Sequence, residues 1–332
     1  MKKRIGVSLI SVLVLLSLLL SGCSFGKSKV VWSVGLLDRQ LFKIEDEKCS
    51  LGQGEIVLAN YINNYSEKFG KKLWSIEKSK ELESYLKDTT LSQLAKMTCM
   101  SMLADKEKVV LSKQEKKNVV QASDAYYKSL SKKELDFFQV TQEEILELYE
   151  RYALATKMYT QLTGGVNEEV SDDDARVVDV LQIFVKSKET AEVIGKKLEQ
   201  GGEFKNIANY YNETDSIEVS YGRMDLPIEV EEKIFAMNDD EISEEIPTKD
   251  GYLFIQCISK LNREKTEANK KIIVEQRAME AFDDVYHTFI KDLKTEYNSK
   301  TWKEVTLSKE KEVTTASFFQ TFEKYCGSLA GK

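Results

Sequence analysis

The sequence has few prolines, few histidines and no excess of positive charge. It contains two prolines, Pro227 and Pro247, and one histidine, His287, among 332 residues. Because 42% of the residues are hydrophobic and 31% are charged, we expect a folded chain without long disordered segments between its ends. The formal net charge is -7, and lysine and glutamate are mixed along the chain without a basic patch. The composition therefore argues against nucleic acid as a partner.

The sequence also lacks an apolar run long enough to cross a membrane. The apolar run at residues 5–20 has sixteen residues, fewer than the ~20 that span a bilayer. Lys2, Lys3 and Arg4 precede this run, and small residues follow it. This order is typical of a secretory signal peptide, and an uncleaved transmembrane anchor is the alternative. The sequence therefore predicts a signal peptide over residues 1–22 and an extracytoplasmic protein.

The apolar run ends in the sequence LSGC, residues 20–23, which resembles the bacterial lipobox. In a lipobox the cysteine receives a thioether-linked diacylglycerol, and the peptide before it is removed. The resemblance implies a lipid on Cys23, and two acyl chains suffice for stable anchoring. We therefore expect a lipoprotein that is anchored to the cell membrane through Cys23, with residues 23–29 as a tether.

Four further cysteines, Cys49, Cys99, Cys257 and Cys326, are scattered over the rest of the chain. They could form two disulfides in an oxidising compartment, with three possible connectivities. A chain of this length does not need such a framework, and the spacing matches no metal motif. We therefore favour buried free thiols, and we expect neither a metal nor a cofactor.

Residues 30–165 contain two short apolar strands followed by several amphipathic helices. The hydrophobic residues of these helices recur at the three- to four-residue spacing of one helix face. Ser112 with Glu115, and Thr141 with Glu144, have the spacing of capping boxes and indicate the starts of two helices. We therefore expect residues 30–165 to form an N-terminal helical domain.

An acidic stretch, VNEEVSDDDA, separates this domain from a segment of mixed helix and strand pattern. Residues 176–262 combine apolar strands with amphipathic helices, and Pro227 lies in the first turn of a short helix. A long helix follows, and its apolar stripe consists of Ile272, Met279, Phe282, Tyr286, Phe289 and Leu293. We expect this stripe to pack onto the N-terminal helices. Residues 263–332 then return to the helical domain, and residues 176–262 form an insertion in it.

The order of elements in residues 176–262 resembles a parvulin-type prolyl isomerase domain. The sequence VLQIFVKSKETAEVIGKKLEQGGEFKNIANYY is similar to the opening strand and helices of that family. VEEKIFAMNDDEISEEIPTKDGYLFIQCISKL is similar to its closing section. The flanking helices resemble the chaperone part of PrsA/SurA-like extracytoplasmic foldases. The resemblance implies an α+β protein, in which a SurA-like helical domain carries an inserted four-stranded sheet flanked by helices.

The catalytic centre of the parvulins is where the sequence departs from the family. Parvulins have one histidine in the first strand and one in the last, together with a Cys or Asp. The resemblance places Gln182 and Leu253 at the two histidine positions, and Thr214, or Asp215 with a slip of one residue, at the third. The single histidine, His287, lies outside this segment. We therefore name no catalytic residue with assurance and expect isomerase activity to be weak or lost.

Three apolar residues fall where the family lines its proline-binding site: Met224, Leu226 and Val230. The alternative is that all three belong to the hydrophobic core. Rotation about an X-Pro bond crosses a barrier of ~18–20 kcal/mol without breaking a bond. A site can therefore accelerate it by holding the proline ring in an apolar pocket and favouring the twisted amide over the planar one. Because leucine can neither donate nor accept a hydrogen bond, a site with Leu253 should bind better than it catalyses.

These observations together predict a membrane-anchored foldase or chaperone that binds unfolded secreted polypeptides. An active peptidyl-prolyl cis-trans isomerase is the first alternative. A non-enzymatic solute-binding or scaffold lipoprotein is the second. The sequence argues against a solute receptor because it lacks the long alternation of strands and helices that builds two lobes.

Overall fold

The computed structural model describes residues 29–31, 36–37 and 39–330. Residues 1–22 and Cys23, for which the sequence predicts a signal peptide and a lipid, lie outside the described residues. None of the described helices is both long and apolar enough to cross a membrane. All four described cysteines are buried and free, as predicted.

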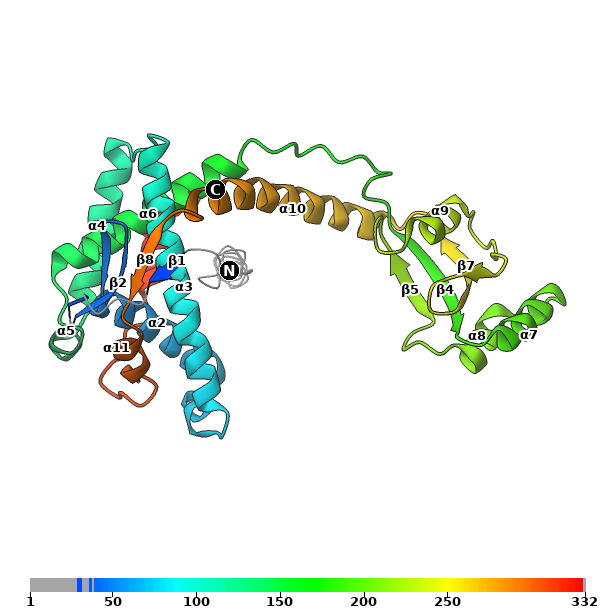
Figure 1. Cartoon of the computed structure of the whole chain (residues 1–332), viewed down its shortest axis with the longest axis horizontal. Coiled ribbons are helices and arrows are strands. Elements are labelled where there is room, and N and C mark those ends of the chain that lie inside the picture. The colour runs from blue at the N-terminus through cyan, green and yellow to red at the C-terminus, as the bar shows by residue number, and fades with distance from the viewer. Residues whose placement is uncertain (1–28, 32–35, 38, 331–332) are drawn as a thin grey trace, which may run out of the picture. The chain divides into compact units, whose positions relative to one another are not determined.

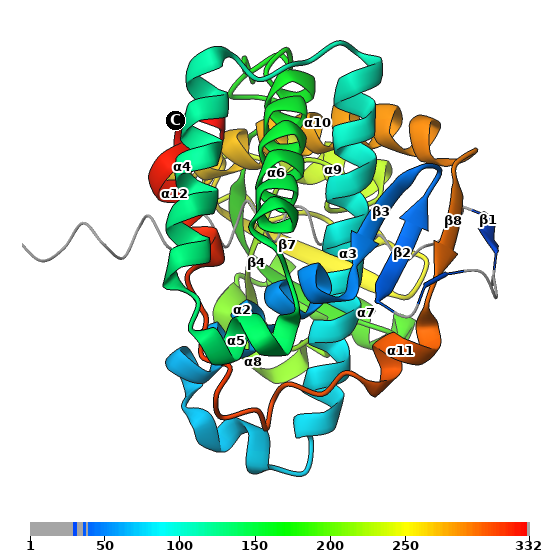
Figure 2. The ribbon, with the colours of Figure 1, turned by 90° about the vertical axis from the view of Figure 1, so that its left-hand side faces the viewer.

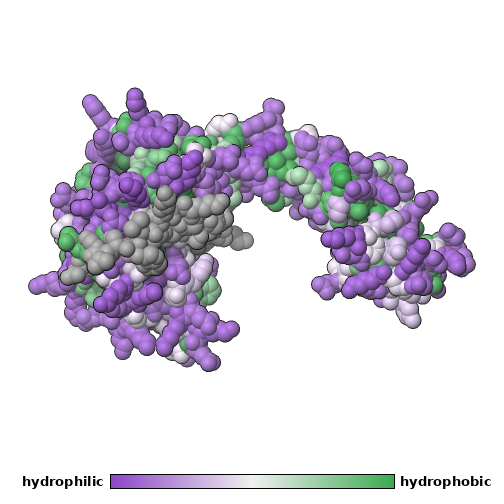
Figure 3. Space-filling view, viewed as in Figure 1, coloured by the Kyte–Doolittle hydropathy of each residue, from purple (hydrophilic) through white to green (hydrophobic). Residues whose placement is uncertain are grey.

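The chain divides into two compact units, whose elements are labelled in Figure 1. The helical unit consists of Met1–Gly165 and Met279–Lys332, and the mixed unit consists of Val166–Ala278. Helix α10, Arg263–Ile290, contributes its first part to the mixed unit and its last part to the helical unit. On the face that Figure 3 shows, hydrophilic residues cover most of the surface of each unit.

The helical unit contains a small sheet with the strand order β1-β8-β2-β3. β8 pairs with β1 in parallel and with β2 in antiparallel orientation, so early and late segments of the chain share one sheet. The strands are β1 (Lys29–Val31), β2 (Gln40–Ile44), β3 (Glu47–Ser50) and β8 (Lys294–Tyr297). The helices are α2 (Leu51–Phe69), η1 (Lys71–Ser75), α3 (Ser79–Lys106), α4 (Lys113–Ser129), α5 (Lys132–Phe138), α6 (Gln142–Thr163), α11 (Ser299–Glu304), α12 (Phe318–Cys326) and η2 (Gly327–Ala330).

Capping boxes set the starts of four helices in this unit. The two predicted boxes are confirmed: the side chain of Ser112 accepts a hydrogen bond from the Glu115 amide at α4, and that of Thr141 accepts from the Glu144 amide at α6. Helices α2 and α5 begin with capping boxes as well. Gly164 is the C-cap residue of α6.

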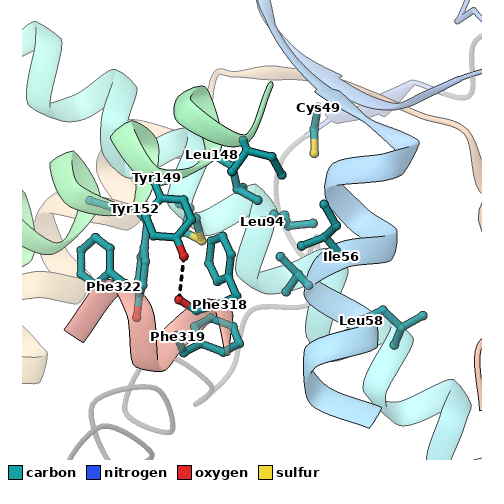
Figure 4. Close-up of a cluster of buried hydrophobic side chains, with 14 of the residues drawn as sticks. Cys49, Ile56, Leu58, Leu94, Leu148, Tyr149, Tyr152, Phe318, Phe319 and Phe322 are labelled. Carbon is teal, nitrogen blue, oxygen red and sulfur yellow. Dashed lines mark hydrogen bonds between the residues drawn. The ribbon is translucent and has the colours of Figure 1, made fainter. Parts of the chain in front are cut away.

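The core of the helical unit joins α6 to the late helix α12. Tyr149 donates its hydroxyl to the carbonyl of Phe318 at 2.9 Å, and the two rings lie 4.5 Å apart. Tyr152 and Phe322 lie 4.1 Å apart, ring to ring, and Figure 4 shows this aromatic cluster between the two helices. Helix α6 also packs beside α3 and α4 (Figure 2). The last described segment of the chain is therefore part of the core.

The mixed unit is built on an antiparallel sheet with the strand order β5-β4-β7-β6. One face packs against α7 and α8 through Leu181, Ile183 and Phe254. The other face packs against α9 and includes Val180 and Ile255. The elements are β4 (Val178–Val185), α7 (Lys188–Glu199), α8 (Phe204–Tyr211), β5 (Glu218–Tyr221), α9 (Ile228–Ala236), β6 (Ile246–Pro247) and β7 (Tyr252–Ser259). The predicted α+β class, with a four-stranded sheet flanked by helices, is confirmed.

The apolar stripe of α10 packs on the helical unit over only part of its length. Phe282 and Tyr286 are 2% and 3% exposed and belong to the core of that unit, and Phe289 packs against the same core. Ile272 is 49% exposed because the first part of α10 belongs to the mixed unit. The sequence pattern therefore overstates how much of the helix returns to the helical body.

Candidate functional site

A polar cluster interrupts the apolar face of β4 in the mixed unit. Gln182 lies between Val180 and Phe184 on this face and is buried. Its Nε2 donates to Thr214 Oγ1 at 3.1 Å and to the carbonyl of Ser216 at 3.0 Å. The structure therefore brings Gln182 and Thr214, two of the three positions that the family resemblance selected, into direct contact.

The segment between α8 and β5 forms this cluster because Asn212 folds it onto β4. Asn212 follows the last residue of α8, and its Oδ1 accepts the backbone N–H of Phe184 at 3.0 Å. Its Nδ2 donates to the carbonyl and to the hydroxyl oxygen of Thr214, both at 2.9 Å. Asp215 is exposed and borders a shallow surface hollow beside α8. Thr214, and not Asp215, therefore faces Gln182.

Tyr221 of β5 completes the cluster from the other side. Its hydroxyl donates to Gln182 Oε1. Burial raises the pKa of Tyr221, and the negative charge of Asp225 raises it further. The phenol therefore stays protonated near neutral pH and remains a donor. Because Gln182 and Thr214 do not titrate, the cluster is a neutral hydrogen-bond network without a general acid or base near pH 7.

Leu253 lies on the same face of the sheet, in the neighbouring strand β7. Gln182 pairs with Ile255 of β7, and Leu253 pairs with Phe184 two residues along the ladder. Leu253 is 5% exposed and belongs to the apolar cluster under α9. Within the described part of the chain, no group of three or more His, Cys, Asp or Glu side chains is placed to hold a metal ion.

The three residues selected as a proline-binding wall have different environments. Val230 of α9 is 4% exposed and belongs to the core, and Leu226 is half-buried against the same core. Met224 is 87% exposed. The structure therefore does not bring the three side chains together as one wall, and Met224 is presented to solvent.

A buried carboxylate holds the loop that presents Met224. Glu231 of α9 is 6% exposed and accepts the backbone N–H of Met224 at 2.6 Å. It also accepts from Arg223 at 3.2 Å, and Arg223 forms two hydrogen bonds of 3.1 Å with Asp173. The Arg223 guanidinium lies 4.2 Å above the ring of Phe235. The buried carboxylate of Glu231 therefore fixes the backbone of the loop between β5 and α9, and its ion pair with Arg223 supports it.

Comparison with known families matches the segment that contains the Gln182 network to a protein family. A family model described as "PPIC-type PPIASE domain" matches residues 140–270. The chain contains a PPIC-type PPIase domain. This PPIase domain includes both the Gln182 network and the Met224 loop.

Two foldases are similar to the chain that carries this PPIase domain. Foldase protein PrsA 3 of Bacillus cereus is 26% identical over 274 residues, which cover 76% of this chain and 89% of that protein. Foldase protein PrsA of Halalkalibacterium halodurans is 29% identical over 136 residues, covering 36% of this chain and 40% of that protein. The chain is therefore a homologue of the PrsA foldases.

A solved structure also aligns with the chain. The crystal structure of the peptidylprolyl isomerase PrsA from Bacillus cereus covers 85% of this chain, and the alignment covers 96% of that structure. Its TM-score is 0.38, and its sequence identity is 17%.

No histidine falls within the matched range of the PPIase domain. The single histidine of the chain, His287, lies on the part of α10 that belongs to the helical unit. Its ring is 5.8 Å from that of Tyr286. The polar side chains of the network around Gln182 are therefore amide and hydroxyl groups, not imidazoles.

Sequence reasoning missed Tyr221, Asn212 and Glu231. Tyr221 lies two residues after Val219 on β5 and therefore on the same side of the strand, which could be read from the sequence. Its contact with Gln182 depends on the pairing of β5 with β4, which the local pattern does not give. Arg223 lies before the first residue of α9, so its contact with Glu231 does not follow from the spacing of one helix.

Proposed function

We propose that the protein is an extracytoplasmic foldase that binds unfolded secreted polypeptides and has weak or lost prolyl isomerase activity. The match to the PPIase domain and the PrsA homologues support the foldase class. We also propose that a lipid on Cys23 anchors it to the membrane, because residues 20–23 have the lipobox pattern. The exposed Met224 supports binding of apolar client segments.

The observation that supports weak catalysis is that both amide N–H groups of Gln182 are used within the protein. Both hydrogens of its Nε2 are used by Thr214 and Ser216, and its Oε1 is used by Tyr221. A site accelerates rotation of a prolyl bond by binding the twisted amide more tightly than the planar one. An amide whose two N–H groups are already used can donate no further hydrogen bond to the twisted state, and Leu253 offers none at all.

The decisive experiment compares two activities of residues 24–332. The first is the rate of a refolding reaction that is limited by a proline isomerisation, with the protein added at catalytic amounts. The second is aggregation of a chemically denatured test protein. We expect an unchanged refolding rate and less aggregation. An active prolyl isomerase run in the same assay is the positive control.

An active isomerase is the second candidate, which the domain match favours. Acceleration at catalytic amounts would establish it and would contradict the proposal of lost activity. In that case Gln182→Leu should lower the rate of isomerisation, because Gln182 is the buried amide on the face of the sheet that packs against α9. If the protein neither accelerates refolding nor reduces aggregation, the result would instead favour a non-enzymatic scaffold lipoprotein.

A further inference from the structure

The helical unit contains a cavity of about 60 Å³ between α3, α6 and α12. The polar residues Gln93, Lys96 and Glu323 contribute to its lining. Five soft or aromatic side chains of the lining are less than one-tenth exposed. They are Met97 and Met100 of α3, Tyr152 of α6, and Phe319 and Phe322 of α12. Figure 4 shows Tyr152 and Phe322 lying against each other in this region.

The cavity reaches the surface between the end of α6 and η2. Thr156 and Tyr159 of α6, together with Gly327 and Ala330 of η2, line the cavity and are partly exposed. The methionine and aromatic residues form the buried part, and these four residues form the mouth. A segment of polypeptide can therefore approach the mouth from solvent and insert one side chain.

One buried polar group in the lining lacks a partner. Gln93 of α3 is 4% exposed, and its Oε1 accepts the hydroxyl of Tyr61 at 3.2 Å. Burial raises the pKa of Tyr61, so the phenol stays protonated and donates. Within the described residues, Gln93 Nε2 has no hydrogen-bond partner. A buried donor without an acceptor is rare in folded proteins, and each case needs an explanation.

We propose that this cavity binds one apolar side chain of an unfolded polypeptide, while the Gln93 amide donates to a backbone carbonyl of the same segment. The volume holds roughly four water-sized groups, which matches the four side-chain carbons of leucine. Methionines adapt to side chains of different shape. Because every residue has a carbonyl, this donor recognises a polypeptide without regard to its sequence. The proposal rests on the proposed function, since it names the client group that the helical unit takes.

The test follows the methyl groups of Met97 and Met100 by NMR in residues 24–332 with labelled methionine methyls. The ligand probes are two blocked tripeptides, acetyl-Gly-Leu-Gly-amide and acetyl-Gly-Ala-Gly-amide. We expect the leucine peptide to shift the Met97 and Met100 signals in a saturable way and the alanine peptide to shift them much less. Met237, which lies in the core of the mixed unit, is the internal control.

Two sets of variants separate the apolar and polar parts of the site. Ala155→Phe places a ring in the cavity and should abolish the leucine-dependent shift. Tyr61→Phe removes the donor to Gln93 Oε1 and serves as the reference for Tyr61→Phe combined with Gln93→Leu. The double variant should bind the leucine peptide about three- to tenfold more weakly than the reference, the value of one hydrogen bond. This pair keeps the test valid if Ala155→Phe does not fold.

The outcomes distinguish this inference from the proposed function. Reduced aggregation of a test protein without any shift of Met97 or Met100 would overturn the cavity site and leave the foldase proposal intact. A saturable shift without reduced aggregation would overturn the foldase proposal and leave the cavity as a peptide site. Equal binding by Tyr61→Phe and the double variant would overturn the role of Gln93.

Discussion

Met224 has a backbone conformation that side chains rarely adopt. Its φ is +68°, in the left-handed region, and its amide is held there by Glu231. Because the side chain is 87% exposed, no packing within the protein offsets the strain. Such strain costs about 1 kcal/mol and tends to be kept where it serves binding. Met224 therefore lowers the stability of the PPIase domain while its exposed side chain stays available for binding.

Met224→Gly should stabilise the PPIase domain and weaken binding of unfolded polypeptides. Glycine adopts positive φ without strain, so we expect a gain of about 0.5–1 kcal/mol, measured by hydrogen exchange in β4 and β7. Asp240→Gly is the matched control, because Asp240 lies in the same domain with φ +63° and is exposed. It should leave client binding unchanged. Full client binding by Met224→Gly would show that the exposed side chain has no such role.

At single positions, the sequence predicted which residues lie in contact better than it predicted whether a side chain is exposed or buried. The resemblance placed Gln182 and Thr214 in one site, and they are in contact. It also grouped Met224 with Val230, although one is exposed and the other is core. The difference arises from Glu231, whose buried carboxylate sets the loop backbone. Such a long-range hydrogen bond leaves no periodic signal in the sequence.

At the scale of elements, prediction works where the signals are local. The predicted capping boxes begin α4 and α6. The sequence leads us to expect that residues 263–332 return to the helical domain, but the pairing of β8 with β1 and the individual contacts of α12 are not predicted, because they join segments far apart in the chain. Such contacts depend on tertiary structure, which overrides local pattern.

Glu134 connects two such elements in the helical unit. Its Oε2 accepts the backbone N–H of Ser131 at the start of α5, and its Oε1 accepts those of Thr314 and Thr315 before α12, all at 2.8 Å. Burial alone would raise the pKa of Glu134, but these hydrogen bonds hold it below its ordinary value. The carboxylate form is therefore the one that joins the early helix to the late segment.

Glu134→Gln should destabilise the helical unit by about 1–3 kcal/mol. The NH2 group of the glutamine would replace one of the two carboxylate oxygens and would then face the backbone N–H groups that this oxygen accepts. The measurement is urea unfolding followed by tryptophan fluorescence. Glu143→Gln, an exposed glutamate on α6, should change stability by less than about 0.5 kcal/mol. Because the pKa of Glu134 is lowered, its stabilisation is present above the ordinary pKa of glutamate and is lost as the pH falls through the lowered value. Equal stability of the two variants at pH 7 would contradict this account.

At the scale of the whole molecule, the two units have separate hydrophobic cores. They should therefore unfold as separate transitions, and one global unfolding free energy would not describe the chain. No tryptophan occurs between residues 166 and 278. Tryptophan fluorescence therefore reports the helical unit alone, even in the full chain.

That separation allows a pH effect to be assigned to the helical unit. Burial raises the pKa of Glu55 from 4.5 to about 7, although the nearby charge of Arg39 opposes the shift. Between these two values the folded state binds more protons than the unfolded state, so the unfolding free energy should fall as the pH rises. The fall ends above about pH 7 and amounts to about 3 kcal/mol at most.

Glu55→Gln removes the titrating group and should flatten this dependence. The variant should be more stable than the wild type at pH 8, and the difference should shrink as the pH falls toward 5. The measurement is the urea midpoint from tryptophan fluorescence at several pH values, with Glu143→Gln as the control that keeps the wild-type slope. If Glu55→Gln and the wild type show parallel pH profiles, Glu55 titrates near its ordinary pKa, which would contradict this account.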